Sequence, residues 1–340
     1  MEHGGSRVGA PGNSKAIPLV RAPTDSKAVP KPSYRGKVRD VYDLGDKLLL
    51  VSSDRLSAFD VVFEDTIPDK GKILNSISAH WFSLLRDVPH HLITARADEL
   101  PSPFNAPQFA GRSALVRKSQ RIDFECVVRA YLMGSGYKEY LASQTLAGEK
   151  LPAGLGKGAK LPQPVFTPAV KNDSGHDENI SFAEMQKRLS PAESRGLSTA
   201  APGGLSDLAQ TLKAKSLQIF AFAYELLEQK GILLLDTKFE FGILNNEVIL
   251  IDEIFTPDSS RFVERSDYER AIAEGREIPT MDKQIVRDYV ESIGWDKNPP
   301  APRLPKEVIE KTVQQYRKME SIILSLTPQP PLPEGEGASG

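Results

Sequence analysis

The sequence predicts an α+β protein with a strand-rich N-terminal lobe and a larger mixed α/β lobe that ends in helices. Residues 34–116 consist mostly of short alternating or aliphatic runs, which are typical of strands. Amphipathic stretches with capping signals become frequent only after residue 180. The 340 residues, 40% hydrophobic and 26% charged, provide enough apolar side chains for a substantial core.

Composition divides the chain into four segments. Residues 1–30 and 327–340 are rich in Gly, Pro, Ser and Ala or Glu, and we expect both to be flexible extensions. Between them we expect a strand-rich lobe over 31–120 and the larger lobe over 121–326.

Charge and cysteine content exclude several classes of protein. Lys plus Arg is 43 and Asp plus Glu is 45, so the net charge of −2 predicts neither nucleic acid nor an anionic membrane as a partner. The single cysteine, Cys126, excludes an intrachain disulfide framework and zinc clusters of cysteine. No apolar run approaches the length of a bilayer span, and we expect no secretory signal in the N-terminal segment. We therefore expect a cytoplasmic protein.

In the first lobe, one helix interrupts the strands. The spacing of Ile77, Trp81 and Leu84 predicts a helix over 75–87, with Asn75 or Ser76 as its N-cap. A hairpin turn is expected at 44–46.

In the larger lobe, a strand is expected over 124–129 and loops over 141–165 and 190–204. The pairs Ser181 with Glu184 and Ser266 with Glu269 each have the spacing of a capping box, which predicts a helix after each serine. Two longer helices are predicted, over 206–230 before the C-cap Gly231 and over 305–326 after Pro305.

The stretch "LLLDTKFEFG" (233–242) reads as a strand interrupted by charges at every second position. Asp236, Lys238 and Glu240 would share one face, because side chains alternate along a strand. A second strand, "EVILIDE", follows the turn dipeptide Asn245-Asn246. A two-residue loop would place Glu240 opposite Ile251, whereas an odd loop or bulge would place it opposite Asp252. We predict the odd loop.

Glu240 and Asp252 would then form a pair of carboxylates beside a lysine. Such a pair suits Mg²⁺ held against polyphosphate, because Mg²⁺ takes one or two carboxylates together with phosphate oxygens and water. The alternative is a half-solvated sheet with salt-bridged surface charges. The apolar flanks "LLL" and "FEF" argue against that alternative.

Other polar stretches predict ligand contacts only weakly when taken one by one, and for each the alternative is a solvated surface segment. They are "RGKVRD" with Lys37, "VVRAYLMGSGYKEY" with Arg129 and Ser135, "TPDSSRF" with Arg261, "MDKQIVR" with Arg287, and the polar loop "KNDSGHDENIS".

Taken together, these stretches resemble the SAICAR synthetase family over about residues 34–326. The resemblance rests on motifs that occur in the family's order: "GKVRDVY", "SSDRLSAFD", "IPDKGKILNSIS", "VVRAYLMGSGYKEY", "FTPAVKNDSGHDENISF", "DTKFEFG", "IDEIFTPDSSRF" and "DKQIVRDY". Within the family, the chain resembles the long, single-polypeptide form. Val170, Val263 and Met281 depart from the residues common at those positions, and none of the three replaces a charged site residue.

The resemblance implies a SAICAR synthetase-like fold whose first lobe binds nucleotide. It also implies an ATP-dependent ligase of purine biosynthesis that joins L-aspartate to carboxyaminoimidazole ribonucleotide (CAIR), giving SAICAR, ADP and phosphate through an acyl phosphate, with Mg²⁺. Rival hypotheses are a Mg²⁺-dependent small-molecule kinase and a nucleotide sensor without turnover. We expect a monomer.

Residue roles are carried over from the family motifs. For ATP they are Gly36, Lys37, Arg39, Lys171, Glu240 and Asp252, of which Glu240 and Asp252 also hold the metal. For the ribotide they are Arg129, Ser135, Asp236, Lys238, Arg261 and Arg287, with Asp177 as a further substrate contact. Asp236, Lys238 and Lys171 are the expected catalytic residues, and Asp54 and Ser57 are the expected aspartate contacts.

Overall fold

The computed structural model describes Met1 and residues 29–171, 178–190 and 208–327. Its first sheet has the strand order β1-β2-β3-β7-β6 and antiparallel pairing throughout. The strands are β1 (Tyr34–Arg35), β2 (Arg39–Asp43), β3 (Lys47–Ser52), β6 (Leu92–Thr94) and β7 (Ser113–Arg117). The expected turn between β2 and β3 is confirmed, with Gly45 at a φ of 93°.

A separate hairpin, β4 (Arg55–Ala58) with β5 (Val61–Thr66), packs on the C-terminal helices. Short 3-10 helices follow later, at Ala97–Glu99 and Pro107–Phe109.

Helix α1 (Lys70–Leu84) begins five residues earlier than the sequence predicts. The prediction of Asn75 or Ser76 as N-cap is wrong, because the cap position is Asp69 in a left-handed conformation and its side chain makes no capping bond. Instead, Asp54 Oδ1 accepts a hydrogen bond from the Gly71 amide at 2.9 Å. A Cβ at Gly71 would lie 2.3 Å from the Ser52 carbonyl oxygen, so only glycine fits there. The helix thus begins where the carboxylate of Asp54 satisfies one of its first amides.

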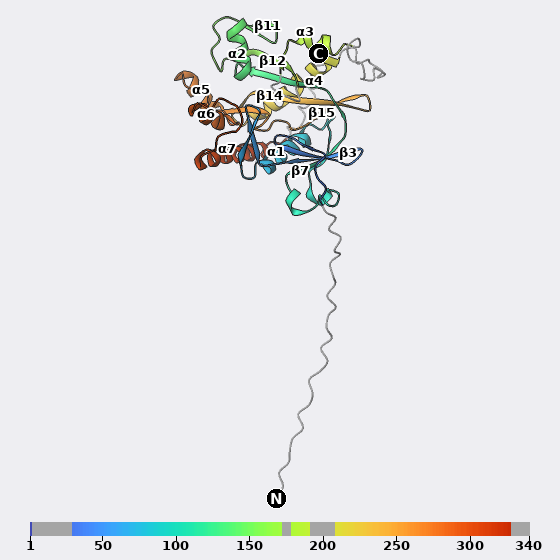
Figure 1. The fold of residues 1–340 in the computed structure, drawn as a ribbon. Helices are drawn as coiled ribbons and strands as arrows, with labels where there is room; N and C mark the ends of the chain where they lie inside the picture. The colour runs from blue at the N-terminus through green and yellow to red at the C-terminus, as the bar shows by residue number, and fades with distance from the viewer. Residues whose placement is uncertain (2–28, 172–177, 191–207, 328–340) are drawn as a thin grey trace, which may run out of the picture.

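The second sheet carries the longest strand and forms the centre of the molecule (Figure 1). Its order is β13-β12-β9-β14-β15, and β8 and β16 also pair with β14. The strands are β8 (Gln120–Arg121), β9 (Phe124–Tyr131), β12 (Lys160–Val170), β13 (Glu178–Asn179), β14 (Ile232–Leu244), β15 (Glu247–Ile251) and β16 (Ser260–Glu264). Helix α4 (Leu208–Glu228) packs against β9, β12 and β14.

The segment 141–165 contains more structure than the expected loop. It holds a small hairpin, β10 (Thr145–Leu146) with β11 (Glu149–Lys150), and the start of β12. The expected loop over 190–204 lies outside the described residues, apart from Ser190.

The remaining helices test the capping predictions. They are α2 (Gly134–Ser143), α3 (Phe182–Arg188), α5 (Arg265–Ala273), α6 (Gln284–Ser292) and α7 (Lys306–Leu324). Ser181 caps α3, as predicted, by accepting from the Glu184 amide. The Ser266 prediction is wrong, because β16 leads directly into α5 and leaves Ser266 inside the first turn. Gly231 follows α4 with a φ of 72°, as a C-cap glycine should.

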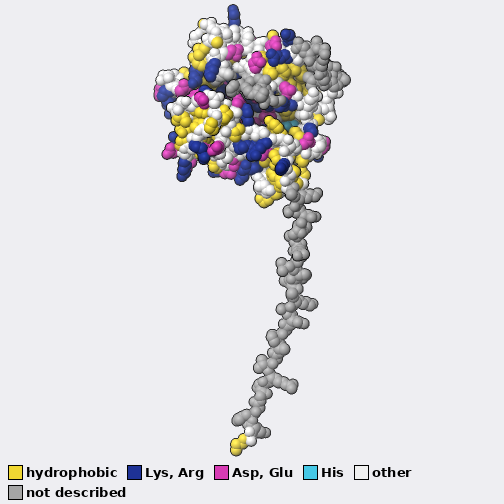
Figure 2. All heavy atoms as spheres, in the orientation of Figure 1, with side chains coloured by type: hydrophobic (Ala, Val, Ile, Leu, Met, Phe, Trp, Pro, Cys, Tyr) yellow, Lys and Arg dark blue, Asp and Glu magenta, His cyan; other side chains and the backbone are white. Residues whose placement is uncertain are grey.

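The described residues pack mainly as one large core, which combines α1, α4 and the second sheet. None of the helices in the described ranges is both long and apolar enough to cross a bilayer. Basic and acidic side chains are interspersed over the face shown in Figure 2. The division at residue 120 into two lobes stays a prediction.

The hairpin of β14 and β15 has the register that we did not predict. Glu240 lies opposite Ile251, and Leu244 lies opposite Glu247, so the loop has two residues. Asn245 and Asn246 have φ values of 51° and 62°, which match the primed turn that favours tight hairpins. The odd loop is therefore wrong, because the turn residues determine the register.

Because Asn246 is left-handed, the turn should tolerate glycine but not a β-branched residue. We expect Asn246→Val to lower the free energy of unfolding by about 1–2 kcal/mol, the cost of a left-handed conformation. Asn246→Gly should change it by only a few tenths. Urea unfolding of both variants measures the difference, and equal stabilities would contradict the two-residue turn.

Candidate active site

Strand β14 places charged side chains on one face and core side chains on the other. Thr237, Phe239 and Phe241 are buried in the core. On the opposite face, Asp236 and Glu240 are only 5% and 4% exposed, so they are buried as well. The predicted alternation is confirmed, and the charged face is an interior polar wall rather than a solvated surface.

Toward its C-terminal end, this face forms a cluster of carboxylates around two lysines. Lys238 Nζ lies 2.5 Å from Glu240 Oε1, 3.4 Å from Asp252 Oδ2 and 3.6 Å from Glu125 Oε1. The other oxygen of Glu240 lies 2.5 Å from Lys171 Nζ. We call Glu125, Lys171, Lys238, Glu240 and Asp252 the carboxylate cluster.

Asp252 joins this cluster in spite of the register. Its φ of 65° is left-handed, so the chain turns directly after β15. Asp is among the residues that adopt this conformation most readily. Arg39 on β2 forms an ion pair with Asp252 and lies 3.4 Å from Glu253 Oε1. The first sheet therefore contributes a cation to the carboxylate cluster.

The charges of the cluster keep its central pair ionised. Burial alone would raise the pKa of Glu240, but the charges of Lys238 and Lys171 and their hydrogen bonds lower it to about 2. Burial would lower the pKa of Lys238, but the charges of Glu240 and Glu125 raise it above its ordinary value. At neutral pH Glu240 and Lys238 therefore form a charged pair at the centre of the cluster.

Carboxylate oxygens are ligands that Mg²⁺ prefers. In the described ranges, no group of three or more His, Cys, Asp and Glu side chains is arranged to hold a metal ion. Glu240 and Asp252 would therefore have to share a metal with oxygens of a ligand or water.

Toward the start of the same strand, Asp236 is the centre of an arginine cluster. Asp236 Oδ2 accepts from Arg129 Nη1 at 2.9 Å and from Arg261 Nη1 at 2.5 Å. Asp282 Oδ2 accepts from Arg287 Nη1 at 3.1 Å and lies 3.9 Å from Arg261 Nε. We call Arg129, Asp236, Arg261, Asp282 and Arg287 the arginine cluster.

Buried Arg129 makes further bonds that fix its orientation. Its Nε donates to Thr167 and its Nη2 donates to Ser135, both at 3.0 Å. Burial lowers the pKa of Arg129, while the charge of Asp236 opposes that shift. The charge of Asp236 raises the pKa of Arg261. Both guanidinium groups are held in place by one carboxylate.

Two glycines allow these arginines to approach helix α2. A Cβ at Gly134 would lie 2.6 Å from Arg261 Nη2, and a Cβ at Gly136 would lie 3.0 Å from Arg129 Cδ. Gly134 also has a φ of 53°. Glycine at both positions therefore allows the side chains of Arg261 and Arg129 to lie against α2.

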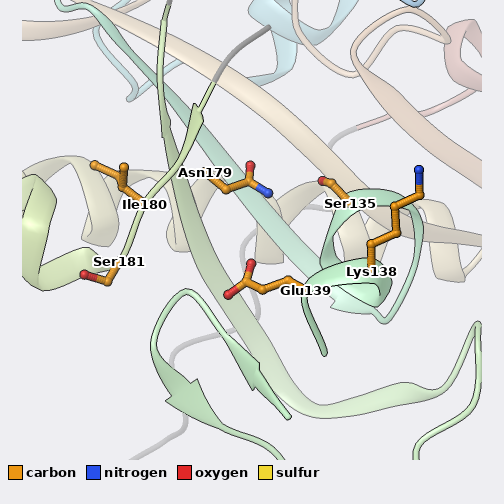
Figure 3. A pocket seen from close by; sticks show the side chains of 6 residues that line it. All are labelled: Ser135, Lys138, Glu139, Asn179, Ile180 and Ser181. Carbon is orange, nitrogen blue, oxygen red and sulfur yellow. The ribbon is translucent and has the colours of Figure 1, made fainter. Parts of the chain in front are cut away.

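A pocket of about 560 Å³ opens beside Ser135. Figure 3 shows Ser135, Lys138 and Glu139 on α2 facing the segment Asn179–Ser181 across it. Ser135 therefore links this open space to the arginine cluster.

Other predicted site residues lie outside both clusters. Lys37 forms an ion pair with Asp60 at 2.6 Å on the surface. Gly36 begins a tight turn, in which its amide donates to the Arg39 carbonyl at 2.8 Å.

The two residues expected to contact aspartate also lie apart from the clusters. Asp54 is bound by Arg112, at 3.2 and 3.3 Å, as well as by the Gly71 amide. Ser57 lies on β4 opposite Val62. Asp177 lies outside the described residues.

Sequence reasoning missed Glu125, Glu253 and Asp282. Glu125 was within reach, because it shares a strand face with Arg129 four residues later. Glu253 adjoins Asp252, which was expected to hold the metal, and Asp282 lies in the motif that contains Arg287. Both lie in irregular segments, where no period predicts the direction of a side chain.

His91 was also missed, and its burial makes the stability of the fold depend on pH. His91 is 5% exposed, and burial together with the charge of Arg39 lowers its pKa to about 3. In the unfolded chain it titrates near 6.5. The pKa of His91 is lower in the folded protein than in the unfolded chain. The folded protein is therefore unaffected by this residue above pH 6.5, and it loses stability as the pH falls from 6.5 toward 3.

Between pH 7 and pH 5 this histidine should account for a loss of about 2 kcal/mol in the free energy of unfolding. His91→Gln should remove that part of the pH dependence. His80→Gln is the matched control, because His80 is only partly buried and its ring bonds the Leu326 carbonyl. Urea unfolding at both pH values measures the three proteins, and an unchanged pH dependence in His91→Gln would contradict a neutral buried His91.

Comparison with known proteins extends over most of the chain. The family model described as SAICAR synthetase matches residues 32–302. The phosphoribosylaminoimidazole-succinocarboxamide synthase of Leptospira interrogans is 54% identical over 88% of this chain and 98% of its own length. The protein of the same name from Thermodesulfovibrio yellowstonii is 47% identical over 86% of this chain and 94% of its own.

A solved structure agrees with these matches. The SAICAR synthase of Saccharomyces cerevisiae, complexed with SAICAR, is similar with a TM-score of 0.72 and 34% identity. The similarity covers 86% of this chain and 94% of the yeast chain.

Proposed function

The chain belongs to the SAICAR synthetase family and is an ATP-dependent ligase of purine biosynthesis, and we propose that its two clusters form one active site. The proposed reaction joins the amine of L-aspartate to the carboxylate of CAIR and gives SAICAR, ADP and phosphate. The carboxylate cluster would contact the nucleotide and its metal. The arginine cluster would contact the ribotide.

The observation that carries this proposal is the arrangement of β14. One strand face holds Asp236 in the arginine cluster and, two and four residues on, Lys238 and Glu240 in the carboxylate cluster. Residues two apart on a strand are about 6.6–6.8 Å apart along its axis. Ligands bound at the two clusters would therefore have adjacent reacting ends, which a transfer between ATP and a carboxylate requires.

Glu240 and Asp252 fit Mg²⁺ as oxygen ligands. Both form ion pairs with Lys238 in the free protein. A bound Mg²⁺ would supply charge neutralisation on the phosphate oxygens. Lys171, Lys238 and Arg39, which pair with these carboxylates, are then the side chains available to contact phosphate. Gly36 and Lys37, in the turn before Arg39, would cover the phosphates.

The arginine cluster fits a phosphorylated ribotide. Arg261 and Ser135 are proposed for its phosphate, and Arg129, Asp236, Lys238 and Arg287 for the rest of the molecule. Arginine forks bind phosphate and carboxylate in a bidentate manner. The predicted catalytic roles of Asp236, Lys238 and Lys171 are orientation and charge stabilisation at the junction of the two clusters.

We propose that the chemistry proceeds through an acyl phosphate. A ribotide carboxylate oxygen attacks the γ-phosphorus of ATP, and ADP leaves. The aspartate amine then attacks the acyl carbon, phosphate leaves with the carboxylate oxygen, and the amine loses a proton. Activation is needed because a carboxylate oxygen is a poor leaving group until it is phosphorylated.

The proposal also covers the contacts of the third substrate, L-aspartate, and the oligomeric state and location of the enzyme. Asp54 and Ser57 are proposed to contact aspartate, and Asp177 to contact a substrate, although Asp54 also caps α1 through Gly71. We further propose a monomer in the cytoplasm without a nucleic-acid partner.

One assay tests the function against its rivals. The protein is incubated with ATP, Mg²⁺ and CAIR, with and without L-aspartate. We expect ADP formation that requires CAIR, and SAICAR only when aspartate is present. A kinase would release ADP and leave a phosphorylated product with no need for aspartate. ATP binding without ribotide-dependent ADP would identify a sensor and refute the ligase.

A further inference from the structure

A third group of charged side chains shares no residue with the two clusters proposed for ligands. The side chains of Lys70 and Asp258 are 0% and 2% exposed, and that of Lys283 is 13% exposed. Lys70 Nζ and Lys283 Nζ lie 2.8 and 3.0 Å from the same oxygen, Asp258 Oδ2. These contacts are ion pairs without hydrogen-bond alignment, since neither Lys70 Nζ nor Asp258 Oδ2 has a hydrogen-bond partner. Tyr316 donates to Asp258 Oδ1 at 2.7 Å.

The carboxylate of Asp258 thus ties together three helical elements. Lys70 is the first residue of α1, Lys283 is the N-cap of α6, and Tyr316 lies in α7. Burial would raise the pKa of Asp258, but the charges of Lys283 and Lys70 lower it, so the group is ionised. Buried ion pairs contribute little net stability, because removing the charges from water offsets their attraction. They do, however, connect the starts of α1 and α6 to α7 through a single carboxylate.

Asp258 lies in the segment 252–261, whose two ends belong to the two ligand clusters. Asp252 begins the segment in the carboxylate cluster, and Arg261 ends it in the arginine cluster. The Ser259 carbonyl accepts from the Lys238 amide at 3.0 Å, so the segment also runs along β14. On the other side, Lys283 adjoins Asp282, which holds Arg287. Moving Asp258 would shift both clusters.

We propose that Asp258 is a positioning residue, which holds the segment 252–261 so that the carboxylate and arginine clusters keep one relative placement. This inference rests on the proposed function. Asp258 contacts Lys70, Lys283 and Tyr316, none of which belongs to either ligand cluster, and its proposed effect is on the alignment of two bound substrates. Loss of alignment lowers the rate of the chemical step without weakening either substrate's own contacts.

The test uses variants that leave the ligand clusters intact. Lys283→Met leaves one buried lysine with one carboxylate, so the remaining pair is neutral overall. We expect kcat to fall by about 10- to 100-fold, the usual cost of misalignment. The KM values for ATP and CAIR should each change by less than about threefold. Lys283→Arg keeps the cation and should recover most of the lost rate.

Two further variants keep the test decisive. Tyr316→Phe removes only the hydrogen bond to Oδ1, and it replaces Lys283→Met as the test if that variant does not fold. Ile323→Ala, two turns along α7 at a buried apolar position, lowers stability without touching a charge. All are assayed at a temperature at which circular dichroism shows a fully folded protein.

The outcomes separate this inference from the proposed function. A lower kcat in Lys283→Met or Tyr316→Phe, with unchanged kcat in Ile323→Ala, supports positioning. Wild-type kcat in the charge variants, or an equal loss in the Ile323 control, overturns it. If the wild-type protein itself forms no ADP in response to CAIR, the proposed function fails instead.

Discussion

Glu240→Gln should lower kcat by about 10²–10³-fold while the protein stays folded. The change is nearly isosteric, but it removes the negative charge that meets Lys171 and Lys238 and that would hold the metal. Losing one well-placed electrostatic contact to a transition state typically costs this much. Steady-state kinetics with saturating CAIR and aspartate, over a range of Mg²⁺ concentrations, measures the loss.

The matched control is Glu247→Gln. Glu247 is exposed at the far end of the same hairpin, opposite Leu244, so its substitution removes the same charge without touching the site. We expect wild-type kinetics for this control. A Glu240→Gln enzyme with unaltered Mg²⁺-dependent turnover would show that Glu240 is not a metal ligand.

Arg129→Lys should have the second-largest effect, on both stability and ribotide use. The buried guanidinium makes bonds to Asp236, Thr167 and Ser135, and an ammonium on a shorter reach cannot satisfy all three. We expect the free energy of unfolding to fall by about 3 kcal/mol, as when a buried charged pair is disrupted. The kcat/KM for CAIR should fall by about 10²-fold, whereas the KM for ATP should change little.

Arg121→Lys provides the control for this substitution. Arg121 lies on β8 beside the same strand, but its side chain is exposed and bonds Asp123 at 2.7 Å. Exposed ion pairs contribute about 0–1 kcal/mol, so stability and kinetics should barely change. If Arg129→Lys raised the KM for ATP rather than for CAIR, the assignment of the arginine cluster to the ribotide would be wrong.

Predictions from the sequence were correct for β14 and for the start of α3, where the pattern of nearby residues determines the structure. The alternation of Asp236, Lys238 and Glu240 with buried residues is present in β14, and Ser181 caps α3 as expected. Glu125 could have been found by the same period from Arg129. These features depend on neighbours in the chain, whose placement is fixed by strand and helix geometry.

Predictions were wrong where residues distant in the sequence, or the residues of a turn, determine the start of a helix or the register of a hairpin. Helix α1 begins at Lys70 because Asp54, which is remote in sequence, accepts from the Gly71 amide. The need to bring Asp252 to Glu240 suggested an odd loop, but the Asn-Asn turn imposed two residues. Asp252 reaches the cluster through its own left-handed backbone instead. The expectation of a shared metal site thus grouped Asp252 with Glu240 correctly, although the hairpin register predicted for it was wrong.

The central claim is that β14 brings the ribotide carboxylate to the γ-phosphate of ATP. Transfer of ¹⁸O from carboxylate-labelled CAIR to inorganic phosphate tests directly whether these two groups react. We predict that the inorganic phosphate released in the complete reaction carries one labelled oxygen, because the carboxylate oxygen attacks phosphorus and leaves with it. Release of unlabelled phosphate during SAICAR formation would contradict the account.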